Sequence, residues 1–126
     1  MATGNRTVVP SRKGLRRLWQ AWKYSLAGLG AAWRQEPSFR QEVILVFILA
    51  PVGLWLGESA AERVLLVGSL FLVLIIELLN SAVETIVNRF GEEIHPLSGQ
   101  AKDLGSAAVL IALVNAGTVW LLIWLT

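Results

Sequence analysis

The chain has 126 residues with a formal net charge of +2; 55% of them are hydrophobic, 16% are charged, and the mean hydropathy is +0.59. Soluble domains usually carry about 45–50% apolar and about 25% charged residues, so the composition favours a small membrane protein over a soluble enzyme. With no cysteine and one histidine, the chain excludes disulfide scaffolds, thiolate zinc sites, cysteine nucleophiles and, within one copy, a multi-histidine metal site.

The N-terminal region is basic, since residues 1–42 hold eight of the eleven Lys and Arg but only two of the nine acidic residues. Residues 1–10 lack the apolar core of a signal peptide and are predicted to be disordered. In residues 11–34, Leu and Trp recur at steps of three and four, with Lys and Arg on the opposite side. This pattern predicts an amphipathic helix over about 11–35 that lies in the membrane interface; packing on a soluble core or binding of nucleic acid fits it less well.

Three apolar segments follow, at residues 43–56, 64–87 and 104–125. They predict an all-α membrane protein with transmembrane helices over about 39–57, 63–88 and 103–125, so that residues 11–126 form one membrane domain. Pro37 is expected to break or kink the preceding helix. The first apolar run is shorter than the roughly 20 residues that cross a bilayer, so it spans only if the helix includes residues 38–42 or if the bilayer thins.

The positive-inside rule sets the orientation. The loop at 57–63 has one basic residue and the C-terminus has none. The N-terminus and the 88–103 loop are therefore expected in the cytoplasm, and the C-terminus in the periplasm. Tryptophans are then expected at the outer interface (Trp55, Trp120, Trp124) and at the inner one (Trp19, Trp22, Trp33).

The second span carries a polar stripe, although ionisable residues inside membrane helices are costly and usually functional. At 100° per residue, four polar side chains fall within about 60° of each other: Glu77, Ser81, Glu84 and Asn88. A fifth, Asn80, lies beside them. Counted from Val64 at 1.5 Å per residue, Glu77 lies about 20 Å into the hydrocarbon and Glu84 about 30 Å, at the cytoplasmic boundary.

These depths suggest a general base or proton relay at Glu77 and a Mg²⁺ ligand at Glu84. The alternative is that the stripe joins helices of an oligomer by hydrogen bonds, a role equally open for Ser106 and Asn115. Near the Glu84 end, Lys102 and Asp103 are expected to open the third span, where free backbone N–H groups favour phosphates. No Walker A, Rossmann or protein-kinase motif occurs.

Three motifs carry a resemblance to a known family: FRQE at 39–42, IELLNSAVE at 76–84 and SGQAKDLGSAAVLIA at 98–112. These motifs closely resemble those of bacterial diacylglycerol kinases, and the similarity extends from about Arg17 to the C-terminus. The resemblance implies a homotrimer in the inner membrane, with an amphipathic surface helix, three transmembrane helices and active sites shared between copies. It also implies transfer of the γ-phosphoryl group of MgATP to diacylglycerol, which gives phosphatidic acid.

Carried over by matching positions, the resemblance implies that Glu77 is the catalytic base with Asn80 beside it. It implies that Glu36 and Glu84 hold Mg²⁺. It assigns ATP contacts to Arg17, Tyr24, Glu36, Glu84, Glu93, His95, Lys102 and Asp103. It assigns lipid contacts to Arg17, Trp33, Ser38, Glu42, Arg63, Glu77, Ser106 and Trp120.

One departure from the family pattern is Asn88, where a known member has aspartate. The change removes a charge one turn beyond Glu84 and is expected to weaken metal or ATP affinity. An undecaprenol kinase with the same mechanism remains an alternative. So does an oligomeric ion or proton pathway, in which Glu77 would titrate during transport and no ATP would be consumed.

Overall fold

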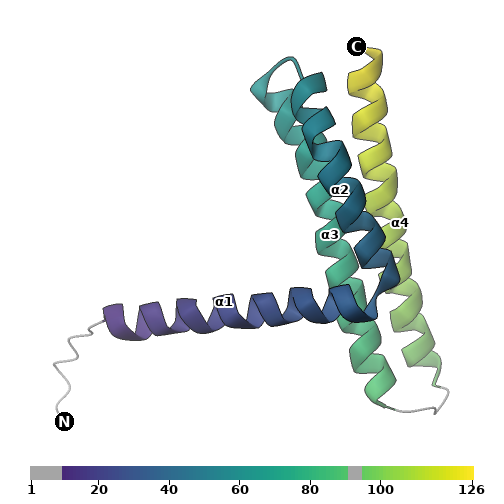
Figure 1. Cartoon of the computed structure of the whole chain (residues 1–126). Helices are drawn as coiled ribbons and strands as arrows, with labels where there is room; N and C mark the ends of the chain where they lie inside the picture. The colour runs from purple at the N-terminus through teal and green to yellow at the C-terminus, as the bar shows by residue number, and fades with distance from the viewer. Residues whose placement is uncertain (1–9, 91–94) are drawn as a thin grey trace, which may run out of the picture. The chain divides into compact units, whose positions relative to one another are not determined.

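The computed structural model describes residues 10–90 and 95–126. Within these ranges the chain forms four helices and no strand: α1 (Pro10–Gln35), α2 (Pro37–Leu56), α3 (Ala60–Arg89) and α4 (Pro96–Leu125) (Figure 1). The last three helices are long and apolar enough to cross a membrane. The predicted all-α membrane class is therefore confirmed. The predicted lead-in at residues 1–10 lies outside the described residues, except for Pro10.

Helix α1 is a unit of its own, and residues 36–126 form a second unit. The 26 residues of α1 correspond to about 39 Å of helix. Its apolar side chains are largely exposed, with 66% of the surface of Leu15 and 61% of that of Trp19 accessible. An amphipathic helix with a free apolar face of this kind is suited to a membrane surface.

The separation of α1 from α2 is local in origin. Glu36 is extended, with φ −119° and ψ 98°, because a residue before proline is disfavoured in the helical region. Pro37 then starts α2, where its fixed φ is favourable and its missing N–H costs nothing. The new helix takes in residues 38–42 and continues through Pro51 for 20 residues, or about 30 Å. This length meets the condition for the short apolar run to span a bilayer.

A tight connection joins α2 to α3. Ser59 caps α3, and its hydroxyl accepts from the Glu62 N–H at 3.1 Å, while the Glu62 carboxylate accepts from the Glu58 N–H at 3.0 Å. Arg63 donates from Nε to the Leu54 carbonyl at 3.0 Å and so satisfies a free acceptor at the end of α2. A side chain at Gly57 would collide with Arg63 Cγ at 2.6 Å.

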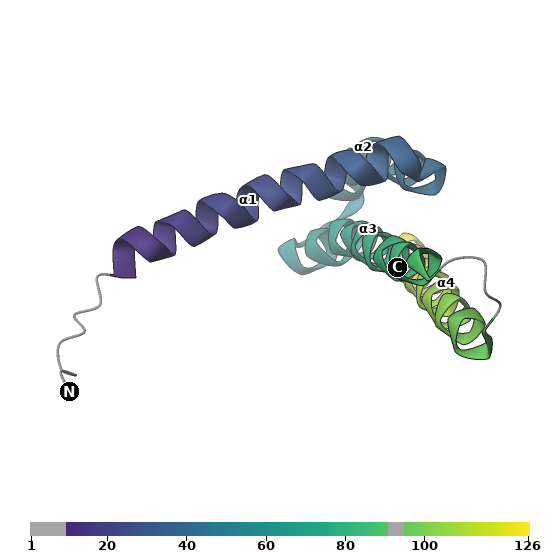
Figure 2. The same cartoon turned by 90° about the horizontal axis from the view of Figure 1, so that it is seen from below.

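Helix α3 packs against both α2 and α4, and the two views of the molecule show it running beside each of them (Figure 1) (Figure 2). Leu66 is fully buried, and Leu70 and Val73 continue the same buried face. The three helices meet where a Cβ on Gly53 would lie 3.2 Å from Leu66 Cβ and 3.3 Å from Trp120 Cζ2. Most other apolar side chains of the three helices remain exposed, as expected where lipid is the solvent.

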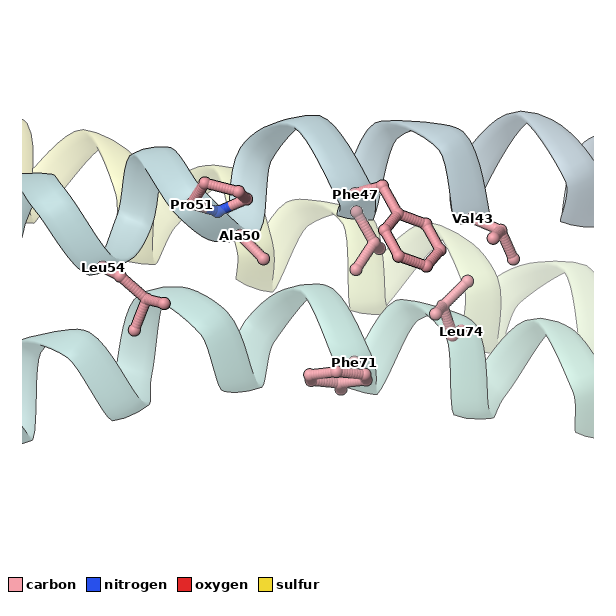
Figure 3. Close-up of a pocket in the computed structure, with 8 residues that line it drawn as sticks. Val43, Phe47, Ala50, Pro51, Leu54, Phe71 and Leu74 are labelled. Carbon is pink, nitrogen blue, oxygen red and sulfur yellow. The ribbon is translucent and has the colours of Figure 1, made fainter.

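An apolar groove of about 300 Å³ lies between α2 and α3. Figure 3 shows Phe47 of α2 and Leu74 of α3 pointing into the space between the two helices. All of its lining residues are apolar: Val43, Val46, Phe47, Ala50, Pro51, Leu54, Phe71 and Leu74.

Candidate active site

A polar cavity of about 260 Å³ lies in the α2–α4 unit, at the end where α2 and α4 begin and α3 finishes. Seven of its eight lining residues are polar, in contrast to the apolar groove. The eight lining residues are Glu36 and Ser38 near the start of α2, Glu77, Asn80, Ser81 and Glu84 on α3, and Ser106 and the apolar Val109 on α4. Four of the five residues of the predicted α3 stripe therefore form one wall of a three-helix cavity, whereas the fifth, Asn88, is exposed and is not among the lining residues.

The α3 wall places two carboxylates in different surroundings. Glu77 is buried, with 8% of its surface exposed, whereas Glu84 is only partly buried. Between them, Asn80 donates from Nδ2 to Oε1 of Glu84 at 3.3 Å. Asn80 Oδ1 is buried and, among the described residues, has no hydrogen-bond partner. The buried carboxylate suits proton transfer, and the outer one, held by an amide, suits a cation.

The start of α2 supplies a third carboxylate. Glu36 is the extended residue before Pro37, so it belongs to neither α1 nor α2, and it lines the cavity. Its backbone carbonyl accepts a hydrogen bond from the Arg40 N–H at 3.2 Å. Its side chain makes no capping hydrogen bond to α2. Six residues further on, Glu42 lies beside Glu77, close enough for the carboxyl groups to interact. Glu42 therefore extends the acidic cluster from α2 toward the predicted base.

Helix α4 closes the third side of the cavity with Ser106 and Val109. It begins earlier than predicted, because Pro96 occupies its first turn and His95 caps it, with Nδ1 accepting from the Leu97 N–H at 3.1 Å. Lys102 and Asp103 are exposed in its second turn. The expectation that they open this helix is wrong, because the first turn lies at residues 96–99. Pro96 has no N–H, and the N–H groups of Leu97, Ser98 and Gly99 all donate to His95.

Other predicted residues are not among those that line the cavity. Arg17, Tyr24 and Trp33 are on α1, which belongs to the other unit. Arg63 is at the opposite end of α3, bonded to α2, and Trp120 is bonded to Leu66. Glu93 lies outside the described residues.

Two lining residues were not predicted for the site. Ser81 belongs to the predicted polar stripe, and its position four residues after Glu77 indicates that it shares the helix face of Glu77. Val109 has no chemical signal of its own, since only the packing of α4 brings it to the cavity.

The Glu36 and Glu84 carboxylates of the cavity fit a magnesium ion that arrives with phosphates. Mg²⁺ is commonly bound by one or two protein carboxylates plus phosphate oxygens and waters. Glu36 and Glu84 supply two carboxylates on one cavity. Throughout residues 10–90 and 95–126, no group of three or more His, Cys, Asp or Glu could form a complete cage. The donor set thus fits a shared metal–phosphate site better than a resident metal centre.

Comparison with known proteins supports the kinase interpretation. A sequence model described as prokaryotic diacylglycerol kinase matches residues 23–124. The chain belongs to the prokaryotic diacylglycerol kinase family. It is 50% identical over 112 residues to a diacylglycerol kinase of Escherichia coli K12, an alignment that covers 88% of this chain and 92% of the relative. It is 52% identical over 107 residues to the diacylglycerol kinase of Haemophilus influenzae, which covers 85% of this chain and 91% of the relative. The predicted family and enzyme class are therefore confirmed: the chain is a membrane-bound lipid kinase that uses a nucleotide phosphoryl donor.

Proposed function

We propose that the chain transfers the γ-phosphoryl group of ATP to the hydroxyl of diacylglycerol, giving phosphatidic acid, at the cytoplasmic face of the bacterial inner membrane. The observation that carries this proposal is the cavity in which the buried Glu77 lies with Glu36 and Glu84 at one end of three membrane helices. A lipid hydroxyl near the bilayer surface and a water-soluble nucleotide can both reach a site at such a boundary.

Glu77 acts as the general base in this proposal. Its carboxylate takes the proton of the lipid hydroxyl as the hydroxyl oxygen forms a bond to the γ-phosphorus, and the bond from that phosphorus to the β–γ bridging oxygen breaks to release ADP. The low exposure of Glu77 keeps competing water away from the reacting oxygen. Asn80 holds the neighbouring carboxylate through its amide and so keeps the polar wall in place.

Glu36 and Glu84 would hold Mg²⁺ against the nucleotide phosphates. When bound, the ion neutralises the charge of the β- and γ-phosphoryl oxygens. Lys102 and Asp103, exposed on the second turn of α4, together with His95 and Glu93, are proposed to contact ATP, as are Arg17 and Tyr24 of α1. Ser38, Glu42 and Ser106 are proposed to contact the lipid, as are Trp33 of α1, Arg63 and Trp120.

The proposal includes a homotrimer with shared sites. Lys102 is exposed and does not line the cavity that holds Glu77, which supports a site completed by a neighbouring copy. The test mixes two inactive variants, Glu77→Gln and Lys102→Ala, during reconstitution. Recovery of activity in the mixed oligomers is expected if one copy provides Glu77 and its neighbour provides Lys102. Activity no higher than that of either variant would contradict shared sites.

The reaction itself is tested with labelled MgATP in mixed micelles that contain either diacylglycerol or undecaprenol. We expect labelled phosphatidic acid, and much slower transfer to the polyprenol. Preferred transfer to undecaprenol would keep the mechanism and overturn the substrate. If a folded oligomer transferred phosphate to neither lipid, the phosphotransfer proposal would fail.

A further inference from the structure

Asn80 of α3 and Gly105 of α4 lie in close contact beside the cavity. A Cβ built on Gly105 would overlap Asn80 Oδ1, with Asn80 Cγ only 3.2 Å away and Asn80 Cβ at 3.8 Å. All three of the nearest atoms thus belong to the Asn80 side chain. The amide of Asn80 therefore occupies the space that a side chain at position 105 would fill.

This contact fixes the amide that holds Glu84. Asn80 Nδ2 donates to Glu84 Oε1 at 3.3 Å, and Oδ1, on the other side of the same planar group, is buried with no hydrogen-bond partner in the described part of the chain. Because the amide is rigid, a push on Oδ1 moves Nδ2 as well. Any group added at Gly105 would consequently disturb the hydrogen bond to Glu84.

The contact is specific to one glycine of α4. Gly99 and Gly117 lie in the same helix, and a Cβ on either would meet nothing within 4 Å. Glycine inside a helix is less favourable than alanine, so at the open positions alanine should be tolerated. At position 105 the absence of a side chain leaves the space that the Asn80 amide occupies.

We propose that Gly105 is a positioning residue for the metal–nucleotide site, acting through Asn80 on Glu84. This inference rests on the proposed role of Glu84 as a metal ligand and adds the contact that orients its carboxylate. Groups that orient a metal ligand without touching the metal typically change affinity by about 10–100-fold when they are altered.

The test measures metal binding without turnover. Mn²⁺, in the presence of a non-hydrolysable ATP analogue, is titrated into the purified full-length chain in micelles and followed by electron paramagnetic resonance. We expect Gly105→Ala to weaken Mn²⁺ binding by about tenfold, as a change behind a metal ligand does. Gly117→Ala, the matched control in the same helix, should bind Mn²⁺ like the unaltered chain. In activity assays, Gly105→Ala should raise the half-saturating Mg²⁺ concentration while leaving the KM for lipid unchanged.

A double substitution separates positioning from general damage. In a chain that already carries Asn80→Ala, the overlap is removed, so adding Gly105→Ala should cause no further loss of Mn²⁺ binding. A further loss in the double variant would overturn the proposal, and this comparison stands even if Gly105→Ala alone does not fold. Unchanged Mn²⁺ binding in a folded Gly105→Ala chain would overturn it as well.

Glu84→Gln distinguishes this inference from the proposed function. If Glu84→Gln weakens Mn²⁺ binding and Gly105→Ala does not, only the positioning role is overturned. If Glu84→Gln binds Mn²⁺ as tightly as the unaltered chain, the metal site of the proposed function fails, and the role of Gly105 fails with it.

Discussion

Trp120 of α4 donates a hydrogen bond from its indole Nε1 to the carbonyl oxygen of Leu66 on α3, at 3.1 Å. The same carbonyl accepts from the Ser69 hydroxyl at 2.9 Å, and Leu66 is the most deeply buried large side chain among the described residues. Backbone carbonyls inside a membrane helix are normally saturated by the helix itself, so this one provides an additional link between two helices. The link lies far along α3 from the polar cavity, and its role is structural.

Removal of this link should weaken the α3–α4 pairing without altering the cavity. Trp120→Phe keeps an aromatic ring but loses the indole N–H, and should lower the free energy of unfolding by about 0.6 kcal/mol, the average for hydrogen bonds between membrane helices. Unfolding in micelles, followed by circular dichroism, measures the change. Trp124→Phe is the matched control because Trp124 is 69% exposed in the same helix. Equal losses in both variants would contradict the structural role of the bond.

Glu77→Gln should remove the proposed base while it keeps the size and hydrogen-bonding capacity of the side chain. Turnover should fall by about 10²–10⁴-fold, the usual contribution of general base catalysis. The helical content of the variant and its binding of ATP should be retained, since Glu77 is not one of the proposed metal ligands. Glu58→Gln, in the exposed connection at the other end of α3, is the control and should keep full activity. Near-normal turnover of Glu77→Gln would show that another group takes the proton.

Glu36→Gln and Glu84→Gln should each raise the concentration of Mg²⁺ that gives half-maximal activity. We expect a change of about tenfold or more, because even groups behind a metal ligand alter affinity by that amount. Removal of Mg²⁺ with a chelator should abolish phosphate transfer but leave the helical circular dichroism unchanged, since two carboxylates form no structural cage. A metal requirement that stays the same in both variants would exclude these residues as ligands.

Asn88→Asp should strengthen metal–nucleotide binding modestly. Asn88 is exposed on α3, four residues beyond Glu84, so a carboxylate there adds negative charge one turn from the proposed metal. For an exposed charge the gain should be about two- to fivefold in apparent Mg²⁺ affinity, and salt should reduce it. Titrations of activity with Mg²⁺ at low and high ionic strength measure both effects. An affinity gain that does not respond to salt would point to a change in geometry.

Local signals in the sequence were sufficient to predict that four helices exist, though not every helix start. The Leu and Trp spacing of α1, the length of the apolar runs and the two prolines at 37 and 96 are local signals, and local backbone preferences determine where a helix begins. The stripe of Glu77, Asn80, Ser81 and Glu84 was predictable for the same reason, since one helix with a fixed turn angle carries all four. The early start of α4 was missed, although Pro96 was visible, because the polar residues before Lys102 were interpreted as loop.

Contacts between helices were decided only by the tertiary structure. That Glu36 and Ser106 join the α3 stripe, that Gly105 receives the Asn80 amide, and that Trp120 reaches Leu66 all depend on the axial register and rotation of neighbouring helices. These are set by how side chains of one helix fit between those of the next, and hydrophobic periodicity gives only the face that is buried. The sequence by itself therefore determined a membrane protein of four helices with an acidic stripe, and the packing of α2 and α4 on α3 made that stripe one wall of a cavity.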